Sequence, residues 1–289
     1  MRPDPLVAAL AAGLRHELHL TPKPGLVDRR DAGSHPDLSL ALMERSIALV
    51  ERCLGAVAAS AARLEPLSAQ VALGREAEAR MLVALGANTH RGAIFLCGLV
   101  VTARPRGVVE AGGGVPGETG GGGRGPSPWE ASLPEAVALT ARALLSDRDL
   151  PASHGAAARR AFGVGGVVGE ALGGLPSVFR AALPAWRAAR ARGRDEDAAA
   201  FAAMAALMQV VEDTTALHRG GAAGLARVRA DGRELARRLE AGEDHLEFLG
   251  RANEAWRAER LTMGGVADLL GLALGLLVHA GELPAAAAP

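Results

Sequence analysis

The stretch that decides the fold is residues 5–28, which read PLVAALAAGLRHELHLTPKPGLVD. Leucine recurs at every fourth position from Leu6 to Leu18, and this spacing lines one face of an α-helix. The two prolines of TPKPG then stop the helix, because proline fixes its own φ and disfavours helical backbone in the residue before it. The pattern predicts a helix over residues 5–20, followed by a stiff, non-helical segment.

The same apolar period continues along the rest of the chain, and no run alternates between apolar and polar residues as a half-buried strand would. We therefore expect an all-α fold: a single multi-helix globular domain over residues 1–289, with residues 108–128 as a Gly/Pro-rich flexible loop. We expect Asp37 to cap the second helix and Gly86 to end the third. The further helices are expected at residues 38–62, 68–85, 93–103, 132–145, 153–162, 176–192, 195–211, 225–240, 243–257 and 266–280.

The composition excludes several classes of protein. Of the 289 residues, 49% are hydrophobic and 22% charged, and the formal net charge is zero. A zero balance argues against a nucleic-acid partner or an anionic membrane, which both select a basic excess. The N-terminus lacks a signal-peptide pattern, and no apolar run free of charge reaches the ~18 residues of a membrane span, so we expect a cytoplasmic protein. Cys53 and Cys97 lack metal-ligand spacing and are expected to be buried thiols, with a disulfide left open.

Scarce residue types concentrate in four short segments. Lysine occurs once in the chain, asparagine twice and threonine eight times. The lysine, one asparagine and five of the threonines fall in residues 21–28, 88–92, 213–221 and 262–268. Because scarce types mark positions that the abundant ones do not serve, we expect these segments to form one functional site.

This set of residues suits the binding of a polyphosphate. Phosphates are bound by cations, by N–H groups at helix N-termini, and at glycines that let the backbone approach. The chain has no Walker A motif around its lysine, so a nucleotide has to be held differently. The substrate-binding candidates are Lys23, Asn88, Thr89, Arg91, Gly92, His218, Arg219, Gly220, Gly264 and Gly265.

Carboxylates near these segments suggest Mg²⁺, which takes one or two carboxylates together with phosphate oxygens. Plainer roles stay open for several residues. Asp213 can be a helix N-cap, His90 and His218 can be structural histidines, and Gly264-Gly265 can be a tight turn. The metal-ligand candidates are Asp213, Asp268 and Glu170.

At these segments the chain resembles the triphosphoribosyl-dephospho-coenzyme-A synthase family, and the resemblance covers residues 20–270. Two positions depart from the family pattern: Thr262-Met263 stands where Ser-Pro is usual, and Val168 where an arginine is common. The matching runs are LTPKPGLVD at 20–28, SH at 34–35, NTHRGAIF at 88–95, SHG at 153–155, GVVGEA at 166–171, DTTALHRGG at 213–221 and GGVADLL at 264–270.

The resemblance implies an all-α enzyme that uses ATP and 3′-dephospho-coenzyme A. Such an enzyme transfers the 5-triphosphoribosyl group of ATP to the ribose 2′-hydroxyl of dephospho-CoA and releases adenine. The product is the prosthetic-group precursor for the acyl carrier subunit of malonate decarboxylase or citrate lyase. The run Asp28-Arg29-Arg30 is more similar to the malonate decarboxylase branch.

For this chemistry the enzyme has to hold a triphosphate, deprotonate a hydroxyl and assist the departing base. His90 and Asp28 are the candidates for the general base, and the sequence leaves the choice between them open. We also expect Lys23, Arg91 and Arg219 to contact phosphates. Two other functions stay open: an Mg²⁺-dependent hydrolase of N-ribosyl or ADP-ribosyl bonds, and a helical binding subunit without catalysis. A homodimer is a further expectation.

Overall fold

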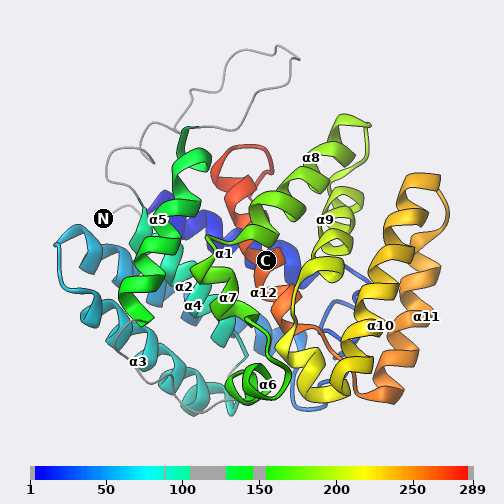
Figure 1. The fold of residues 1–289 in the computed structure, drawn as a ribbon, viewed down its shortest axis with the longest axis horizontal. Helices are drawn as coiled ribbons and strands as arrows, with labels where there is room; N and C mark the ends of the chain where they lie inside the picture. The colour runs from blue at the N-terminus through cyan, green and yellow to red at the C-terminus, as the bar shows by residue number, and fades with distance from the viewer. Residues whose placement is uncertain (1–3, 88, 105–127, 146–153, 286–289) are drawn as a thin grey trace.

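The computed structural model describes residues 4–87, 89–104, 128–145 and 154–285. Over these residues the chain forms α-helices and one π-helical turn, without a strand, which confirms the all-α prediction. Figure 1 shows the helices grouped around α12, which runs through the middle of the molecule. They are α1 (Pro5–His19), α2 (Leu40–Ala62), α3 (Leu67–Leu85), α4 (Arg91–Ala103), α5 (Pro128–Leu145), α6 (His154–Phe162), α7 (Gly166–Leu172), the π-helical turn η2 (Val178–Ala182), α8 (Leu183–Ala191), α9 (Glu196–Val210), α10 (Thr214–Ala241), α11 (His245–Glu259) and α12 (Gly264–His279).

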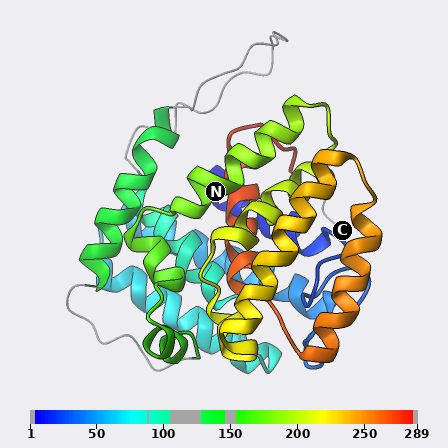
Figure 2. The same ribbon diagram turned by 45° about the vertical axis from the view of Figure 1, so that its right-hand side comes forward.

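The helices α1 and α12, from opposite ends of the chain, form the most extensive helix pair of the fold. They lie together at the centre of the ribbon in both views (Figure 2). Glycines set their separation: a Cβ on Gly13 would lie 2.1 Å from the backbone nitrogen of Gly275, and a Cβ on Gly271 would lie 2.7 Å from Leu14 Cδ2. The two backbones are therefore closer than any larger residue allows at these positions.

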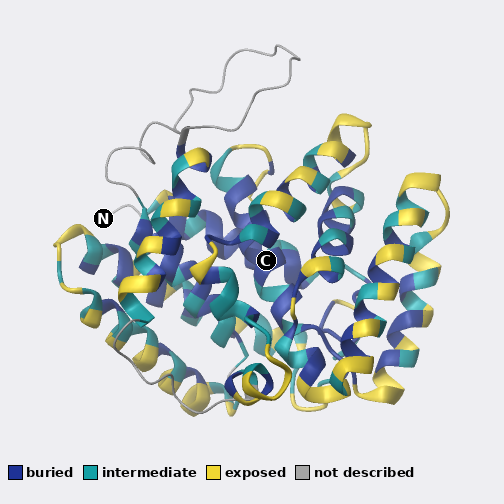
Figure 3. Cartoon of the chain, viewed as in Figure 1, coloured by how far each residue is buried: buried dark blue, intermediate teal, exposed yellow. Residues whose placement is uncertain are grey.

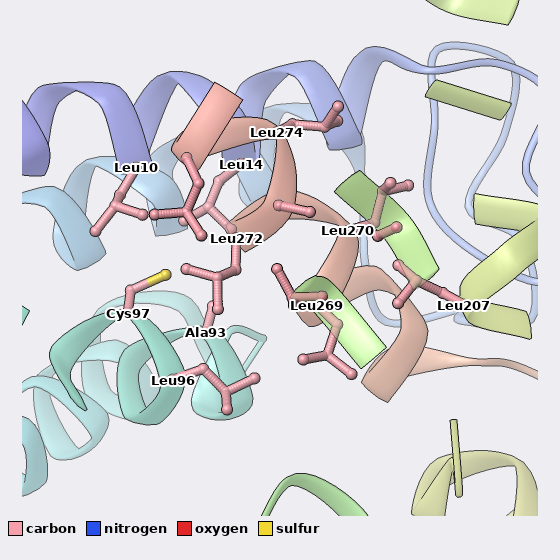
Figure 4. Packing of buried hydrophobic residues seen from close by; sticks show 14 of the residues in the cluster. Leu10, Leu14, Ala93, Leu96, Cys97, Leu207, Leu269, Leu270, Leu272 and Leu274 are labelled. Carbon is pink, nitrogen blue, oxygen red and sulfur yellow. The ribbon is translucent and has the colours of Figure 1, made fainter. Parts of the chain in front are cut away.

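The core surrounds this pair. Buried residues fill the centre of the molecule, whereas the outer faces of α3, α10 and α11 are exposed (Figure 3). Leucines of α1 and α12 interdigitate with side chains of α4 and α9 (Figure 4). The residues in this part of the core include Leu10, Leu14, Ala93, Leu96, Cys97, Leu207, Leu269, Leu270, Leu272 and Leu274.

Most predicted helices agree closely with the structure, and Gly86 ends α3 in the left-handed conformation (φ 72°) as expected. The predicted cap of α2 is wrong. The helix begins at Leu40, two residues later than expected, and Ser39 Oγ accepts the Leu42 N–H at 3.2 Å in the capping position. Asp37 instead lies in the wall of a cavity described below.

The largest error concerns α10, which was predicted to begin at residue 225 and begins at Thr214. Residues 213–221 were expected to be a polar loop or a helix start. Only Gly221 leaves the helical region (φ 61°, ψ −158°), and the helix resumes directly after it. Within residues 176–192, the π-helical turn η2 precedes α8, so the expected single helix is in two parts.

Some predictions fall outside the described residues: the flexible loop over 108–127, and the roles of Asn88 and residue 153. Pro128, the predicted end of the loop, is the first residue of α5. Both cysteines are buried free thiols, so the disulfide alternative is excluded. No described helix combines the length and the apolar character needed to cross a membrane.

Candidate active site

A cavity of about 820 Å³ lies beside the N-terminal ends of α4 and α12. This volume is within the range of small-molecule sites. The structure brings all four predicted segments together around it, and parts of α1, α2, α3, α5, α6 and α7 complete the wall. The lining residues from the four segments are Leu26, Val27, Thr89, His90, Arg91, Gly92, Thr214, Thr215, Arg219, Gly264, Gly265, Ala267 and Asp268.

Two helix N-termini face one another at this end of the cavity. The residues before α4 and α12, His90 and Met263, make no side-chain capping bond to the first turn. Both first turns contain glycine, and neighbouring side chains fill the space that a Cβ would take: Asp268 at Gly92, Thr215 at Gly264 and Asp213 at Gly265. The positive ends of two helix dipoles therefore point toward the same space, which favours an anionic ligand there.

Asp268 stands between these two helix ends. It belongs to α12 and accepts a hydrogen bond from the Ala93 N–H of α4. A Cβ on Gly92 would lie 1.9 Å from Asp268 Oδ2, so only glycine leaves room for the carboxylate. Burial, and next the carboxylates of Glu17 and Asp213, raise the pKa of Asp268 well above its ordinary value. A cation in the cavity would stabilise the ionised form of Asp268.

Asp213 joins the start of α10 to the start of α12. Its Oδ1 accepts the N–H groups of Thr215 (2.8 Å) and Ala216 (2.9 Å) at the start of α10. Its Oδ2 accepts the Val266 N–H at 2.8 Å, at the start of α12. The side chain is buried outside the cavity lining. Asp213 is therefore the N-cap of α10, one of the two roles that the sequence left open.

Lys23, the only lysine, is fully buried and lies outside the cavity lining. Its ammonium Nζ donates to the backbone carbonyl and to Oε1 of Glu17, both at 2.5 Å. Glu17 itself lines the cavity. Burial raises the pKa of Glu17, and the neighbouring Lys23 charge opposes that shift. The lysine thus holds a carboxylate at the cavity wall from the interior side.

Asp28 is buried beside Lys23 and has three backbone donors. Its Oδ2 accepts the Lys23 N–H at 2.8 Å, and its Oδ1 accepts those of Arg30 (2.7 Å) and Asp31 (3.3 Å). It does not line the cavity. These bonds shape the loop after Pro24, which holds Lys23 in position.

His90 lines the cavity at the start of α4, although only 4% of its surface is exposed to solvent. Its Nδ1 lies 2.6 Å from Ser46 Oγ, and Ser46 also contacts the Thr89 hydroxyl. Burial, and next the charge of Lys23, lower the pKa of His90 to about 4. The imidazole is therefore neutral at pH 7 and can accept a hydrogen bond on its unprotonated nitrogen.

Cations surround the opening of the cavity. Arg91 pairs with Glu78 of α3 (Nε to Oε2 3.2 Å) and stays partly exposed. Arg219 is exposed on the first turns of α10, where its charge contributes to the lowered pKa of His35 after the larger effect of burial. Arg75 of α3 and Arg159 of α6 also line the wall. Several arginines can thus reach one anionic ligand.

Three further candidates lie outside the cavity lining, in addition to Lys23, Asp28 and Asp213. Glu170 accepts hydrogen bonds from the Ser177 hydroxyl (2.6 Å) and N–H (3.1 Å), outside the cavity lining. Its pKa is raised, chiefly by burial. His218 and Gly220 are exposed on α10 and lie outside the lining. Asn88 lies outside the described residues.

Within the described part of the chain, no group of three or more His, Cys, Asp or Glu side chains is arranged to hold a metal ion. Mg²⁺ that arrives with a nucleotide needs fewer ligands from the protein, because phosphate oxygens and water fill most of its octahedral shell. A single carboxylate with a raised pKa at the cavity wall fits that requirement, and Asp268 is such a group.

Comparison with known proteins identifies the family. The family model of CitG, described as ATP:dephospho-CoA triphosphoribosyl transferase, matches residues 3–286. The chain belongs to this family. Two relatives have names that agree with the match, a probable 2-(5″-triphosphoribosyl)-3′-dephosphocoenzyme-A synthase of Azotobacter vinelandii and the corresponding synthase of Klebsiella pneumoniae.

The Azotobacter protein is 41% identical over 286 residues, which cover 93% of this chain and 89% of the relative. The Klebsiella protein is 38% identical, with 94% and 93% covered. The chain is therefore a transferase of the CitG family, and the binding-subunit alternative is wrong. No solved structure is similar enough to match.

Glu17, Arg75 and Arg159 are among the charged residues of the cavity wall that were missed from the sequence. Glu17 had a usable signal, because it is a carboxylate beside Leu14 and Leu18 on the buried face of the first helix. A charge in that position calls for a buried partner. The two arginines had no signal, because arginine is abundant along the whole chain.

Proposed function

We propose that this cavity binds ATP and 3′-dephospho-CoA and transfers the 5-triphosphoribosyl group of ATP to the ribose 2′-hydroxyl of the acceptor, releasing adenine. Membership in the CitG family supports this reaction. The observation that carries it to this site is the meeting of two helix N-termini, several arginines and one carboxylate with a raised pKa in a single cavity.

The triphosphate is placed at the first turns of α4 and α12. The positive ends of the two helix dipoles favour an anion there, beside the two N–H groups that Asp268 and Asp213 accept. Arg91 and Arg219 provide the charged contacts, with Thr89 as a hydroxyl donor. Lys23 supports this wall from behind through Glu17 instead of contacting a phosphate.

Asp268 is the residue that would bind Mg²⁺ in this site. Its raised pKa reflects a carboxylate held close to other carboxylates, and a divalent cation between it and the triphosphate would offset that repulsion. When bound, the metal would neutralise part of the phosphate charge. The remaining metal candidates, Asp213 and Glu170, already have backbone or hydroxyl donors on both oxygens.

His90 is the general base in this proposal, and Asp28 shapes the loop of Lys23. His90 faces the cavity, whereas three backbone donors occupy Asp28. With the proton on Nδ1, the ring donates to Ser46 Oγ and leaves Nε2 as the acceptor for the 2′-hydroxyl proton. The transferred carbon is the ribose C1′, and its transition state resembles an oxocarbenium ion, as in glycoside hydrolysis.

We further propose that the product serves malonate decarboxylase, that the enzyme is cytoplasmic, and that it acts as a homodimer. The pathway rests on the similarity of Asp28-Arg29-Arg30 to that branch. Growth of a deletion strain on malonate, rescued by this chain, tests the pathway. Analytical ultracentrifugation tests the dimer.

Mass spectrometry of an incubation with ATP, Mg²⁺ and dephospho-CoA tests the reaction. We expect dephospho-CoA to gain one triphosphoribosyl unit as adenine appears. A matched incubation without dephospho-CoA is the control, because a hydrolase of N-ribosyl bonds would release adenine there as well. An acceptor that gains no mass would exclude the proposed transfer.

A further inference from the structure

The cavity continues beyond its charged end as an arm between α3 and α4. We define the arm by Val71 and Gly74 of α3 and by Phe95, Gly98 and Leu99 of α4, which all line the cavity. The two helices run in opposite directions here, since Glu78 pairs with Arg91 and Gly74 lies opposite Ile94. The N-terminal half of α3 therefore lies along the C-terminal half of α4, away from the triphosphate end.

The arm is long and uncharged. One face of α4 lines the cavity from Arg91 to Thr102, and its part in the arm begins at Phe95. With a rise of about 1.5 Å per residue, the seven steps from Phe95 to Thr102 span roughly 10 Å. The cavity wall carries no charged residue on α4 after Arg91, nor on α3 before Arg75. A ligand part in this arm has to be an extended chain without charge.

Gln70 gives the arm one unused polar group. Its side chain lines the cavity and is 93% buried, since only 7% of its surface is exposed. Its Nε2 donates to Ser60 Oγ (3.0 Å) and to the Glu65 carbonyl (3.2 Å), which fixes the orientation of the amide. Within the part of the chain that the structure describes, no donor reaches Gln70 Oε1. A buried acceptor without a donor indicates a ligand N–H at this place.

We propose that the arm binds the pantetheine chain of the dephospho-CoA acceptor, and that Gln70 Oε1 accepts an N–H from one of its amides. This proposal rests on the proposed function. The reacting ribose atoms and all phosphates of both substrates belong at the charged end. The pantetheine chain is the remaining part that is uncharged and extended, about as long as four or five extended residues, roughly 15 Å.

Gly98 provides a test, because a Cβ built on it meets nothing within 4 Å. A Gly98→Leu side chain begins in this open space and extends into the arm. We expect the KM for dephospho-CoA to rise by about tenfold or more at saturating ATP, since the pantetheine chain loses its apolar contacts. The KM for ATP should not change. ADP, which has the same ribose and diphosphate but no pantetheine, should be used as an acceptor equally well by both enzymes.

Gly55→Leu is the matched control. Gly55 is exposed on α2, outside the cavity, and its Cβ would also meet nothing within 4 Å. It should leave every one of these constants unchanged. Gln70→Met is the second test, because it removes the acceptor and keeps the length of the side chain. We expect weaker use of dephospho-CoA, unchanged use of ADP, and a melting temperature that shows the variant is folded.

A Gly98→Leu enzyme that loses dephospho-CoA and ADP activity equally, or whose KM for ATP rises, would overturn the assignment of the arm. If the wild-type protein makes no product from either acceptor, the proposed function fails separately. Calorimetric titration of dephospho-CoA into the wild type and Gly98→Leu then still decides the matter, because equal dissociation constants would contradict the proposal.

Discussion

Asp268 and Asp213 are two aspartates of one site whose pKa values are both raised by burial, but their hydrogen bonds differ. Asp268 has a pKa raised by burial and by neighbouring carboxylates, so its ionised form disfavours the folded state. Asp213 accepts backbone N–H groups on both oxygens. Matched Asp→Asn variants separate the two roles.

Asp268→Asn should raise the free energy of unfolding at pH 7 by about 1 kcal/mol or more, because one pKa unit corresponds to about 1.4 kcal/mol. It should also abolish transfer. Because the pKa of Asp268 is higher in the folded state, the free energy of unfolding of the wild type falls as pH increases from the ordinary aspartate pKa through the folded pKa. The variant should lack this pH dependence. Urea unfolding at several pH values measures this.

Asp213→Asn should lower the free energy of unfolding by about 1–3 kcal/mol, because the amide NH₂ would face the Val266 N–H and leave that buried donor without an acceptor. The same urea series measures it. If both variants were destabilised alike, the distinction between the two aspartates would be wrong.

Lys23 matters through the group it neutralises. Lys23→Met leaves Glu17 buried without its cation, and breaking such a pair costs about 3–5 kcal/mol. Arg80→Met is the control, since the exposed pair with Glu76 contributes about 1 kcal/mol or less. Adding Glu17→Gln to Lys23→Met should restore part of the loss. A midpoint in urea equal to that of the wild type would contradict the buried pair.

The pH dependence of kcat/KM separates His90 from Asp268. The pKa of His90 is about 4, so His90 is neutral at all higher pH values and adds no limb near 6.5. The acid limb should therefore lie where Asp268 takes up its proton, above the ordinary aspartate value. His90→Gln should lower the plateau and keep the limb in place. A limb that moves with this variant would show that His90 sets it.

For single residues, the sequence predicted the location of the site better than the role of each side chain. The scarcity of lysine and threonine pointed to segments that the fold does bring together. Rarity could not distinguish a side chain that faces a ligand from one that supports the wall. That difference depends on which face of a helix is buried, and Lys23 lies in a loop without such a periodicity.

Among the helices, the contact between α1 and α12 depends on glycine. Gly13→Ala should lower the free energy of unfolding by about 3 kcal/mol or more, because its Cβ would overlap backbone atoms of Gly275 and the core would be overpacked. Gly55→Ala, in open space on α2, should instead stabilise by about 0.5–1 kcal/mol through helix propensity. Thermal unfolding monitored by circular dichroism measures both, and a neutral Gly13→Ala would contradict the close approach.

Helix existence could be predicted because apolar periodicity and capping residues act locally. Ser39 rather than Asp37 caps α2, since either residue is a good cap and only packing decides where the helix begins. The early start of α10 was missed for a related reason. Gly221 adopts a left-handed φ within a helix that neighbouring elements hold together, and a local pattern cannot show those neighbours.

Over the whole molecule, the charged end of the cavity is built from both ends of the chain. Glu17 comes from α1, Asp268 from α12, and Arg91 from α4 between them. A chain that ends at residue 263 should therefore neither fold nor bind ATP, because α1 loses the helix against which it packs. Soluble expression of this shortened chain beside the full one measures the effect. A folded, soluble product would contradict the central place of α12.

This pairing has a consequence for biosynthesis. The apolar face of α1 leaves the ribosome first, and its partner is encoded some 250 residues later. At about 5–20 residues per second, translation leaves that face uncovered for roughly 10–50 s. The position of α12 in the sequence thus sets the interval during which α1 lacks its partner helix, and synonymous codons that slow translation before residue 264 would lengthen this interval.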